Sequence, residues 1–290
     1  MPNRDWTHIR QAWTAAFIGF EYGTVSSIED AIDETIGGDF ENLPTPSVLS
    51  FPGRNVAALQ DATDSALRGA YILATAQNCL MTRQPSWASL DAYHCSLVFC
   101  RAVLGFLGLY FVRIKDTNCV IDIFPEGADG KSRKAFRRQY KQVADPIRLF
   151  YRKRGSLIEQ AGVWALLVRA LRTATLPPSL NTAKRLVLEV GEGFGRARND
   201  ILYNNHEWRF APDLMWPVSF LDLNDDLGSY TDLGKTFSTE RDANFALCRA
   251  IASIAVGLIN DIGPDAGATL LPSYYGPKAL AFRTFKTTGA

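Results

Sequence analysis

The chain has 290 residues, a net charge of +1, 47% hydrophobic residues and 21% charged residues. This length is sufficient for one large domain or two small domains with a buried core, and the composition is that of an ordinary soluble globular protein. Because the net charge is close to zero, the field of the whole molecule indicates no particular partner. The distribution of charge along the chain is more informative.

The cysteines and the apolar segments indicate in which cellular compartment the protein is expected. The five cysteines are an odd number without a CxxC pair, which indicates reduced thiols. The N-terminus lacks a basic flank followed by an apolar signal core. The most apolar run, SLVFCRAVLGFLGLYFV at 96–112, is interrupted by Arg101 and is shorter than the roughly 20 residues that a membrane span needs. We therefore expect a buried helix, no membrane contact and a cytoplasmic protein.

Apolar residues at helical spacing predict helices along most of the chain. The expected helices cover residues 6–22, 27–41, 55–83, 87–113, 156–174, about 182–204 and 239–261. Residues 42–53 contain three prolines and predict a loop, whereas residues 119–124, CVIDIF, predict a short strand. Residues 208–235 look irregular with short strands. We predict a mostly α fold, a helical bundle with a few short β-strands. It forms one domain over residues 1–290, whose core lies at 55–206 with helical additions at both ends.

The stretch RNDILYNNH, residues 198–206, brings a cation, an acid, amides, a phenol and an imidazole together within about two to three helical turns. If the helix continues to residue 206, Asn199, Tyr203 and His206 lie on one face, with Arg198 about 100° away. Arginine can hold a phosphate by two hydrogen bonds, and imidazole can transfer a proton near neutral pH. Cleavage of a phosphodiester by its own 2′-hydroxyl needs these functions and does not require a metal.

An arginine followed by a polar residue, with a histidine after four to six intervening residues near the end of a helix, is the signature of HEPN-type ribonucleases. RND at 198–200 resembles the start of that signature, and AYHCSLVFCRAVLGFLG at 92–108 resembles the early apolar helix of the superfamily. The resembling pieces cover about residues 55–110 and 180–206. The resemblance implies a helical bundle that forms a homodimer, with two Arg/His motifs in one cleft. It also implies RNA as the substrate and a role in toxin–antitoxin or phage-defence systems, with an antitoxin or regulatory protein as a further partner.

The chain departs from this pattern in one respect. Seven residues separate Arg198 from His206, and Tyr203 stands where a four-residue gap would place the histidine. Either His206 acts after a local helix ending or Tyr203 has replaced it, and a phenol with an ordinary pKa of about 10 is a poor base at pH 7. A structural interpretation also remains open, in which Arg198, Asn199 and His206 simply finish a helix. The alternative to a ribonuclease is a non-catalytic helical binding or scaffold protein.

Residues 131–154 carry ten basic residues and one acid, Asp145, with aromatic residues interleaved. Lysine and arginine bind phosphates, and aromatic rings can stack on unpaired bases. The expected nucleic-acid-binding residues are Lys131, Arg133, Lys134, Arg137, Arg138 and Lys141. The alternative is a solvated helix face that pairs with the acidic residues at 29–41.

Two further patterns do not support a metal or cofactor site. His94 and Cys95 are adjacent, so on a helix they point to different sides, and Cys100 has no second ligand cluster near it. GEGFGR at 191–196 neither follows a clear strand nor opens a helix, so it indicates neither a dinucleotide fold nor a P-loop. We therefore predict no metal and no cofactor.

Overall fold

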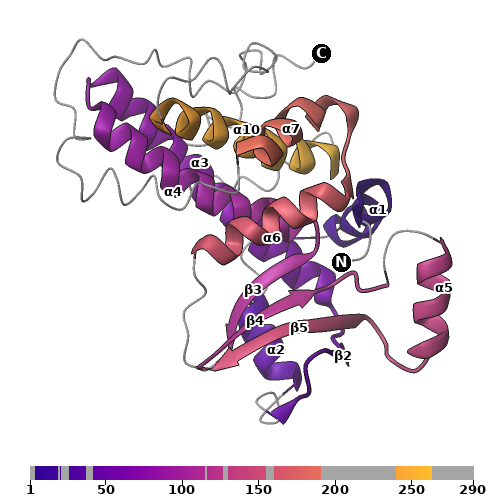
Figure 1. Ribbon diagram of the computed structural model, residues 1–290. Coiled ribbons are helices and arrows are strands. Elements are labelled where there is room, and N and C mark those ends of the chain that lie inside the picture. Colours follow the sequence, from indigo (N-terminus) through magenta and orange to yellow (C-terminus); the bar gives the residue numbers. More distant parts are fainter. Residues whose placement is uncertain are drawn as a thin grey trace.

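The computed structural model describes residues 4–18, 20, 26–36, 42–114, 116–126, 130–154, 160–190 and 240–262, with the backbone alone at 152–154 and 240–243. Within these ranges the chain is mostly helical, which confirms the prediction from the sequence. The strands form a four-stranded sheet and a two-stranded sheet. In Figure 1 most of the helices lie together above the four-stranded sheet.

A hairpin of two long helices forms the centre of the helical part. The helices are α3 (Arg54–Met81) and α4 (Pro85–Phe106), and they run along each other over most of their length. Small residues on α3 let the two backbones come close. At Gly69, for example, an added Cβ would lie 2.9 Å from the ring of Phe99. This close packing makes α3 and α4 a firm support for side chains at their exposed faces.

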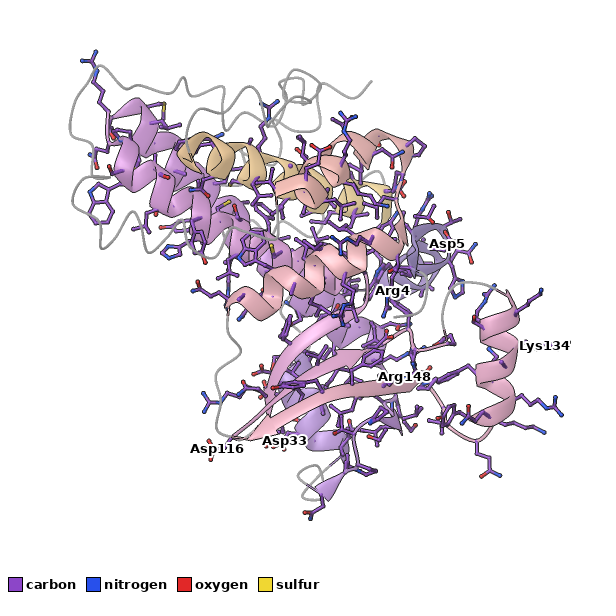
Figure 2. All side chains as sticks on the ribbon, in the orientation of Figure 1. Arg4, Asp5, Asp33, Asp116, Lys134 and Arg148 are labelled. Atoms are coloured by element: carbon purple, nitrogen blue, oxygen red, sulfur yellow. The ribbon has the colours of Figure 1, made fainter. Side chains whose placement is uncertain are left out.

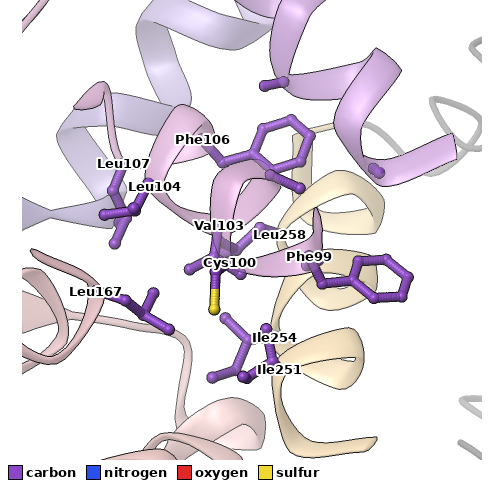
Figure 3. Packing of buried hydrophobic residues seen from close by; sticks show 14 of the residues in the cluster. Phe99, Cys100, Val103, Leu104, Phe106, Leu107, Leu167, Ile251, Ile254 and Leu258 are labelled. Carbon is purple, nitrogen blue, oxygen red and sulfur yellow. The ribbon is translucent and has the colours of Figure 1, made fainter. Parts of the chain in front are cut away.

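Two further helices cover α4, and a third packs on both of them. They are α6 (Gln160–Thr173), α7 (Asn181–Val190) and α10 (Glu240–Ile262), and both α6 and α10 pack directly on α4. Figure 3 shows the centre of this core, where buried side chains of α4, α6 and α10 meet, among them Cys100, Val103, Leu167, Ile251, Ile254 and Leu258. The part Asn244–Ile262 of α10 is apolar and long enough to cross a membrane, with a mean hydropathy of 1.6, but 78% of it is buried inside the protein. Here α10 is a core helix.

The four-stranded sheet is antiparallel, with the order β2-β5-β4-β3. Its strands are β2 (Ser47–Ser50), β3 (Leu109–Ile114), β4 (Thr117–Asp122) and β5 (Pro146–Arg154). Helix α2 (Ile28–Ile36) packs against β3 and α3, behind the sheet in Figure 1. Helix α5 (Gly130–Gln139) connects β4 to β5 and stands at the side of the molecule in the same view. Two candidate surfaces therefore border the sheet. One lies at α5 and the other lies beside α2.

The N-terminal segment is tied into the fold by a small sheet and a buried ion pair. Strand β1 (Arg4–Asp5) pairs in parallel with β6 (Ala174–Thr175), and α1 (Trp6–Phe17) follows β1 directly. The side chain of Arg4 is 1% exposed and contacts both carboxylate oxygens of Asp122, at 2.7 and 2.8 Å. Because both charged groups are removed from water, the loss of either one would leave the other as an unpaired buried charge.

The structure corrects two expectations from the sequence. The helix expected at 87–113 ends at Phe106, and residues 109–114 form β3. The helix ends there because Gly108 adopts a φ of +80°, a left-handed conformation that suits glycine and reverses the chain. The proline-containing segment at 42–53 is not entirely a loop, since Ser47–Ser50 form β2 at the edge of the sheet.

Candidate functional sites

The motif at 198–206 lies outside the described residues. This applies to Arg198, Asn199, Tyr203 and His206 alike, and to the glycine pattern at 191–196. The helix expected at about 182–204 is described as α7 as far as Val190. The catalytic assignment therefore remains a prediction.

The basic segment expected to bind nucleic acid is divided between helix α5 and strand β5. Phe136 is the buried side chain of α5, with 8% of its surface exposed. Arg137 and Arg138 lie in the last turn, where cations are favoured by the helix dipole. The basic side chains that face solvent are Lys131, Lys134, Arg137, Arg138 and, just after the helix, Lys141. In Figure 2, Lys134 projects from the outer side of α5.

A stack of side chains holds α5 against the sheet. The guanidinium carbon of Arg148, on β5, lies 5.5 Å from the ring centre of Phe136 and 5.4 Å from that of Phe150. The ring of Tyr140 extends this stack, with its centre 4.7 Å from that of Phe136. Each cation–π contact contributes about 0.5–1 kcal/mol at an exposed site and more when water is excluded. Arg148 thus positions the helix, whereas Lys131, Lys134, Arg137, Arg138 and Lys141 face outward.

Arg133 differs from its neighbours because it contacts α1. Its Nη1 lies 3.1 Å from Nδ1 of His8, and Arg133 is half-buried. Burial, followed by the charge of Arg133, lowers the pKa of His8 below 6.5, so the ring is neutral at pH 7 and can accept a hydrogen bond. Arg133 therefore helps to fix α5 on the protein and is less available to a phosphate than predicted from the sequence.

The exposed cations of α5 have no carboxylate partner within the described part of the chain. The sequence left open a pairing with acidic residues 29–41. Helix α2 instead packs on α3 and β3, and Glu29 accepts a hydrogen bond at 2.7 Å from the backbone N–H of Arg113. For the acids of α2 that the structure describes, pairing with α5 is therefore not observed. Residues 37–41 lie outside the described ranges.

A pocket of about 370 Å³ opens between α5 and the sheet. Phe136, Arg148 and Phe150 line it together with Glu126. Glu126 pairs with Arg54 at 3.4 Å, while its second oxygen, Oε2, has no hydrogen-bond partner among the described residues. The basic helix therefore borders a pocket with an aromatic wall and one unsatisfied acceptor.

A second pocket, of about 350 Å³, lies where α2, α3, α4 and β3 meet. We call it the mixed-charge pocket. Five charged side chains line it: Glu29, Asp61, Asp64, Arg68 and Arg101. The buried surfaces of Leu104, Leu109 and Tyr110 form its floor. Acidic and basic side chains thus face one cavity.

The carboxyl group of Asp61, in the mixed-charge pocket, has a displaced pKa. Burial raises its pKa from 3.8 to about 6, and the negative charges of Asp64 and Glu29 raise it as well. The positive charges of Arg68 and Arg101 act in the opposite direction and do not cancel these effects. A carboxyl group with this pKa is mostly ionised at pH 7 and can exchange a proton near neutrality.

The residues that α3 contributes to this pocket already have a common helical spacing in the sequence. Asp61, Asp64, Ser65 and Arg68 have the spacing i, i+3, i+4 and i+7, which places them on one face of α3. Arg101 is the single charge inside the apolar run at 96–112. A lone charge in such a run must reach water or a partner, and here it reaches the pocket.

The cysteines near His94 are core residues. Cys95 and Cys100 are fully buried, and burial raises the pKa of both thiols well above 9, which opposes the thiolate form that a metal would need. Among the described residues, no three His, Cys, Asp or Glu side chains are arranged to hold a metal ion.

No protein-family model matches this sequence, and searches of curated proteins and of solved structures give no significant match.

Proposed function

We propose that the chain binds RNA through the α5 surface, defined as Lys131, Lys134, Arg137, Arg138 and Lys141. The observation that supports this proposal best is the exposure of five cations on one short segment, without a carboxylate partner in the described part of the chain. Phosphate backbones are bound by such surfaces through release of counterions. The neighbouring aromatic-lined pocket favours unpaired RNA over a duplex, because bases in a duplex are stacked and not available to rings.

The experiment is an RNA-binding titration by fluorescence anisotropy with a single-stranded oligonucleotide. We expect Arg137→Glu together with Arg138→Glu to weaken binding by roughly tenfold or more and to reduce the salt slope by about 0.7 for each phosphate that the variant no longer binds. Arg169→Glu with Arg185→Glu is the matched control, since it makes the same change of charge at exposed positions on α6 and α7. Equal weakening in both double variants would refute a specific role for α5.

The proposal extends to cleavage of the bound RNA by the HEPN-like motif. In this mechanism Arg198 stabilises the phosphate, His206 transfers the proton, and Asn199 and Tyr203 position the two groups. The resemblance on which it rests also implies a helical-bundle core and a homodimer with two motifs in one cleft. Sedimentation measures the dimer directly.

Cleavage is tested with a 5′-labelled RNA in excess chelator, using wild type, Arg198→Ala and His206→Ala. We expect activity in the wild type and a loss of about 100-fold or more in either variant, because a missing general acid or base typically costs 10²–10⁴-fold. RNA binding without cleavage in all three proteins would leave the non-catalytic binding protein as the function. Equal cleavage in all three would exclude the motif as the catalytic site.

A further inference from the structure

The mixed-charge pocket has an acidic end and a basic end. Asp61 and Arg68 are seven residues apart on α3, which corresponds to roughly 10 Å along the helix axis at 1.5 Å per residue. On α4, which runs in the opposite direction, Gly105 packs at the level of Ala62, and Arg101 comes one helical turn before Gly105. Arg101 is therefore closer to the level of Arg68 than to that of Asp61.

The basic end is more open to solvent than the acidic end, where Glu29, Asp61 and Asp64 are half-buried. Arg68 and Arg101 are exposed, and neither forms an ion pair with another residue that the structure describes. Asp61 lies deeper, next to the buried Tyr110. The two guanidinium groups thus lie at the more exposed end of the pocket, and the carboxylate of Asp61 lies at the less exposed end.

Asp61 receives no hydrogen bond from any residue within the described ranges, although its side chain is half-buried. Its neighbours are already engaged. The hydroxyl of Tyr110 lies 2.7 Å from the carbonyl oxygen of Ala58 and 2.9 Å from that of Gly105, so its proton is used by the backbone. Glu29 accepts from the N–H of Arg113. A half-buried carboxylate without a donor loses part of its hydration without compensation, and a ligand that supplies a donor would offset that cost.

We propose that the mixed-charge pocket binds an elongated small molecule with an amine, guanidinium or amidine donor at one end and a carboxylate or phosphate at the other. The donor group binds Asp61, and the anionic group binds between Arg68 and Arg101. The volume of about 350 Å³ falls within the range of about 300–1,000 Å³ typical of small-molecule sites.

Two classes of compound carry this chemistry: an amino acid with a long cationic side chain, and a guanine nucleotide. In the first, the guanidinium group of arginine would pair with Asp61 through two hydrogen bonds. In the second, the N1–H and amino group of guanine would do so, and the phosphate would replace the carboxylate at Arg68 and Arg101. Both compounds place the donor and the anion at opposite ends, as the pocket requires.

The test is isothermal titration calorimetry with L-arginine and with 5′-GMP, each at up to about 10 mM so that a millimolar Kd is measurable. Agmatine lacks the carboxylate of arginine, and guanosine lacks the phosphate of GMP. We expect one of the two complete ligands to bind, and its truncated partner to bind at least about tenfold more weakly, because it lacks the charge-assisted contacts with Arg68 and Arg101. Which of the two binds identifies the class. The absence of binding by both complete ligands to folded protein would overturn the proposal.

The variants assign the binding to this pocket. Asp61→Asn and Arg68→Gln with Arg101→Gln should each weaken the bound ligand by about tenfold or more. Asp33→Asn, at an exposed position on α2, is the control for removal of an acid. The double substitution at Arg68 and Arg101 changes only exposed side chains, so it remains informative if Asp61→Asn fails to fold. Unchanged affinity in both pocket variants would place the ligand elsewhere and refute the assignment.

The α5 surface could also bind GMP through its phosphate. The titration is therefore repeated in the Arg137→Glu, Arg138→Glu background. Retained GMP affinity there, with reduced affinity in the pocket variants, supports the mixed-charge pocket. The reverse result would assign the nucleotide to the α5 surface and count against the pocket.

Discussion

Replacing Asp61 by asparagine should make the protein more stable at pH 7. In the folded state burial raises the pKa of Asp61 from 3.8 to about 6, so the folded protein holds this proton more tightly than the unfolded chain does. The free energy of unfolding therefore falls as the pH rises from about 4 to about 6, and the full decrease is present above pH 6. At about 1.36 kcal/mol per pKa unit, this interval corresponds to roughly 3 kcal/mol. Asparagine removes the ionisation and should recover about 1–3 kcal/mol, because its amide also needs partners.

Urea denaturation of wild type and Asp61→Asn over the range from about pH 4 to pH 7.5 measures this effect. The difference in the free energy of unfolding should be small at the acidic end and grow toward neutrality. Asp33→Asn is the control and should show no such growth, since Asp33 is exposed. Asp64→Asn removes a negative charge that raises the pKa of Asp61, so it should move the transition to lower pH. A difference between wild type and Asp61→Asn that does not depend on pH would refute the reasoning.

Four further variants test the fold that carries the two sites. Gly108→Ala should cost about 2 kcal/mol or more in denaturant titrations, because Gly108 has a φ of +80° and its new Cβ would lie 2.4 Å from the ring of Phe124; unchanged stability would contradict this. Asp122→Asn should cost about 3–5 kcal/mol by leaving Arg4 as a buried charge, and Arg4→Met with Asp122→Leu should cost less than the single change. Phe136→Ala should release α5, so that trypsin cleaves after its basic residues faster while the main unfolding transition is retained.

The long helix α3 could be predicted from the sequence because its buried residues recur at helical spacing. On α3 the buried residues, such as Leu59, Ala62, Ala66 and Leu73, recur every three or four positions, and this period is independent of what packs on them. The predicted range 55–83 therefore agrees closely with the observed Arg54–Met81.

The boundary between α4 and β3 could not be predicted in the same way. Residues on all sides of α4 near its C-terminus are buried, among them Val103, Leu104, Gly105 and Phe106, so the apolar pattern loses its period. Strand β3 continues the apolar run at once, with alternate residues such as Phe111 and Arg113 less buried. The conformation of Gly108 marks the change, and a glycine in an apolar run does not reveal its φ.

Strand β2 could not be predicted from the sequence, because the strand with which it pairs is distant along the chain. Strand β2 has four residues and pairs with β5 in the register that places Leu49 opposite Ile147. A segment of that length has little preference by itself, and its partner lies about a hundred residues away along the chain. In β5 the alternation of buried Ile147 and Leu149 with less buried Arg148 and Phe150 was hidden by the high density of charge around it.

The exposed charges of the candidate sites could be predicted from the sequence better than their other features. The cations of α5 are exposed, as a run of like charges requires, but the different position of Arg133 against His8 depends on the docking of α1. The mixed-charge pocket could not be assembled in advance, since its charged residues come from α2, α3 and α4. No local pattern indicates which faces of three helices will meet.

The two proposed sites should respond differently to salt, and this difference can be measured on one protein. Binding of single-stranded RNA by up to five cations gives a slope of log K against log salt of up to about −3.5, or roughly a hundredfold decrease in affinity for a fourfold rise in salt. In the mixed-charge pocket the ligand carries both signs of charge, and the contact with Asp61 is shielded from water, so screening should cost only a few-fold. Charge reversal at Arg137 and Arg138 should flatten the first slope and leave the second unchanged. If it flattened both, one surface would serve both ligands, and the physical distinction between a solvent-facing cation helix and a shielded carboxylate pocket would not hold for this protein.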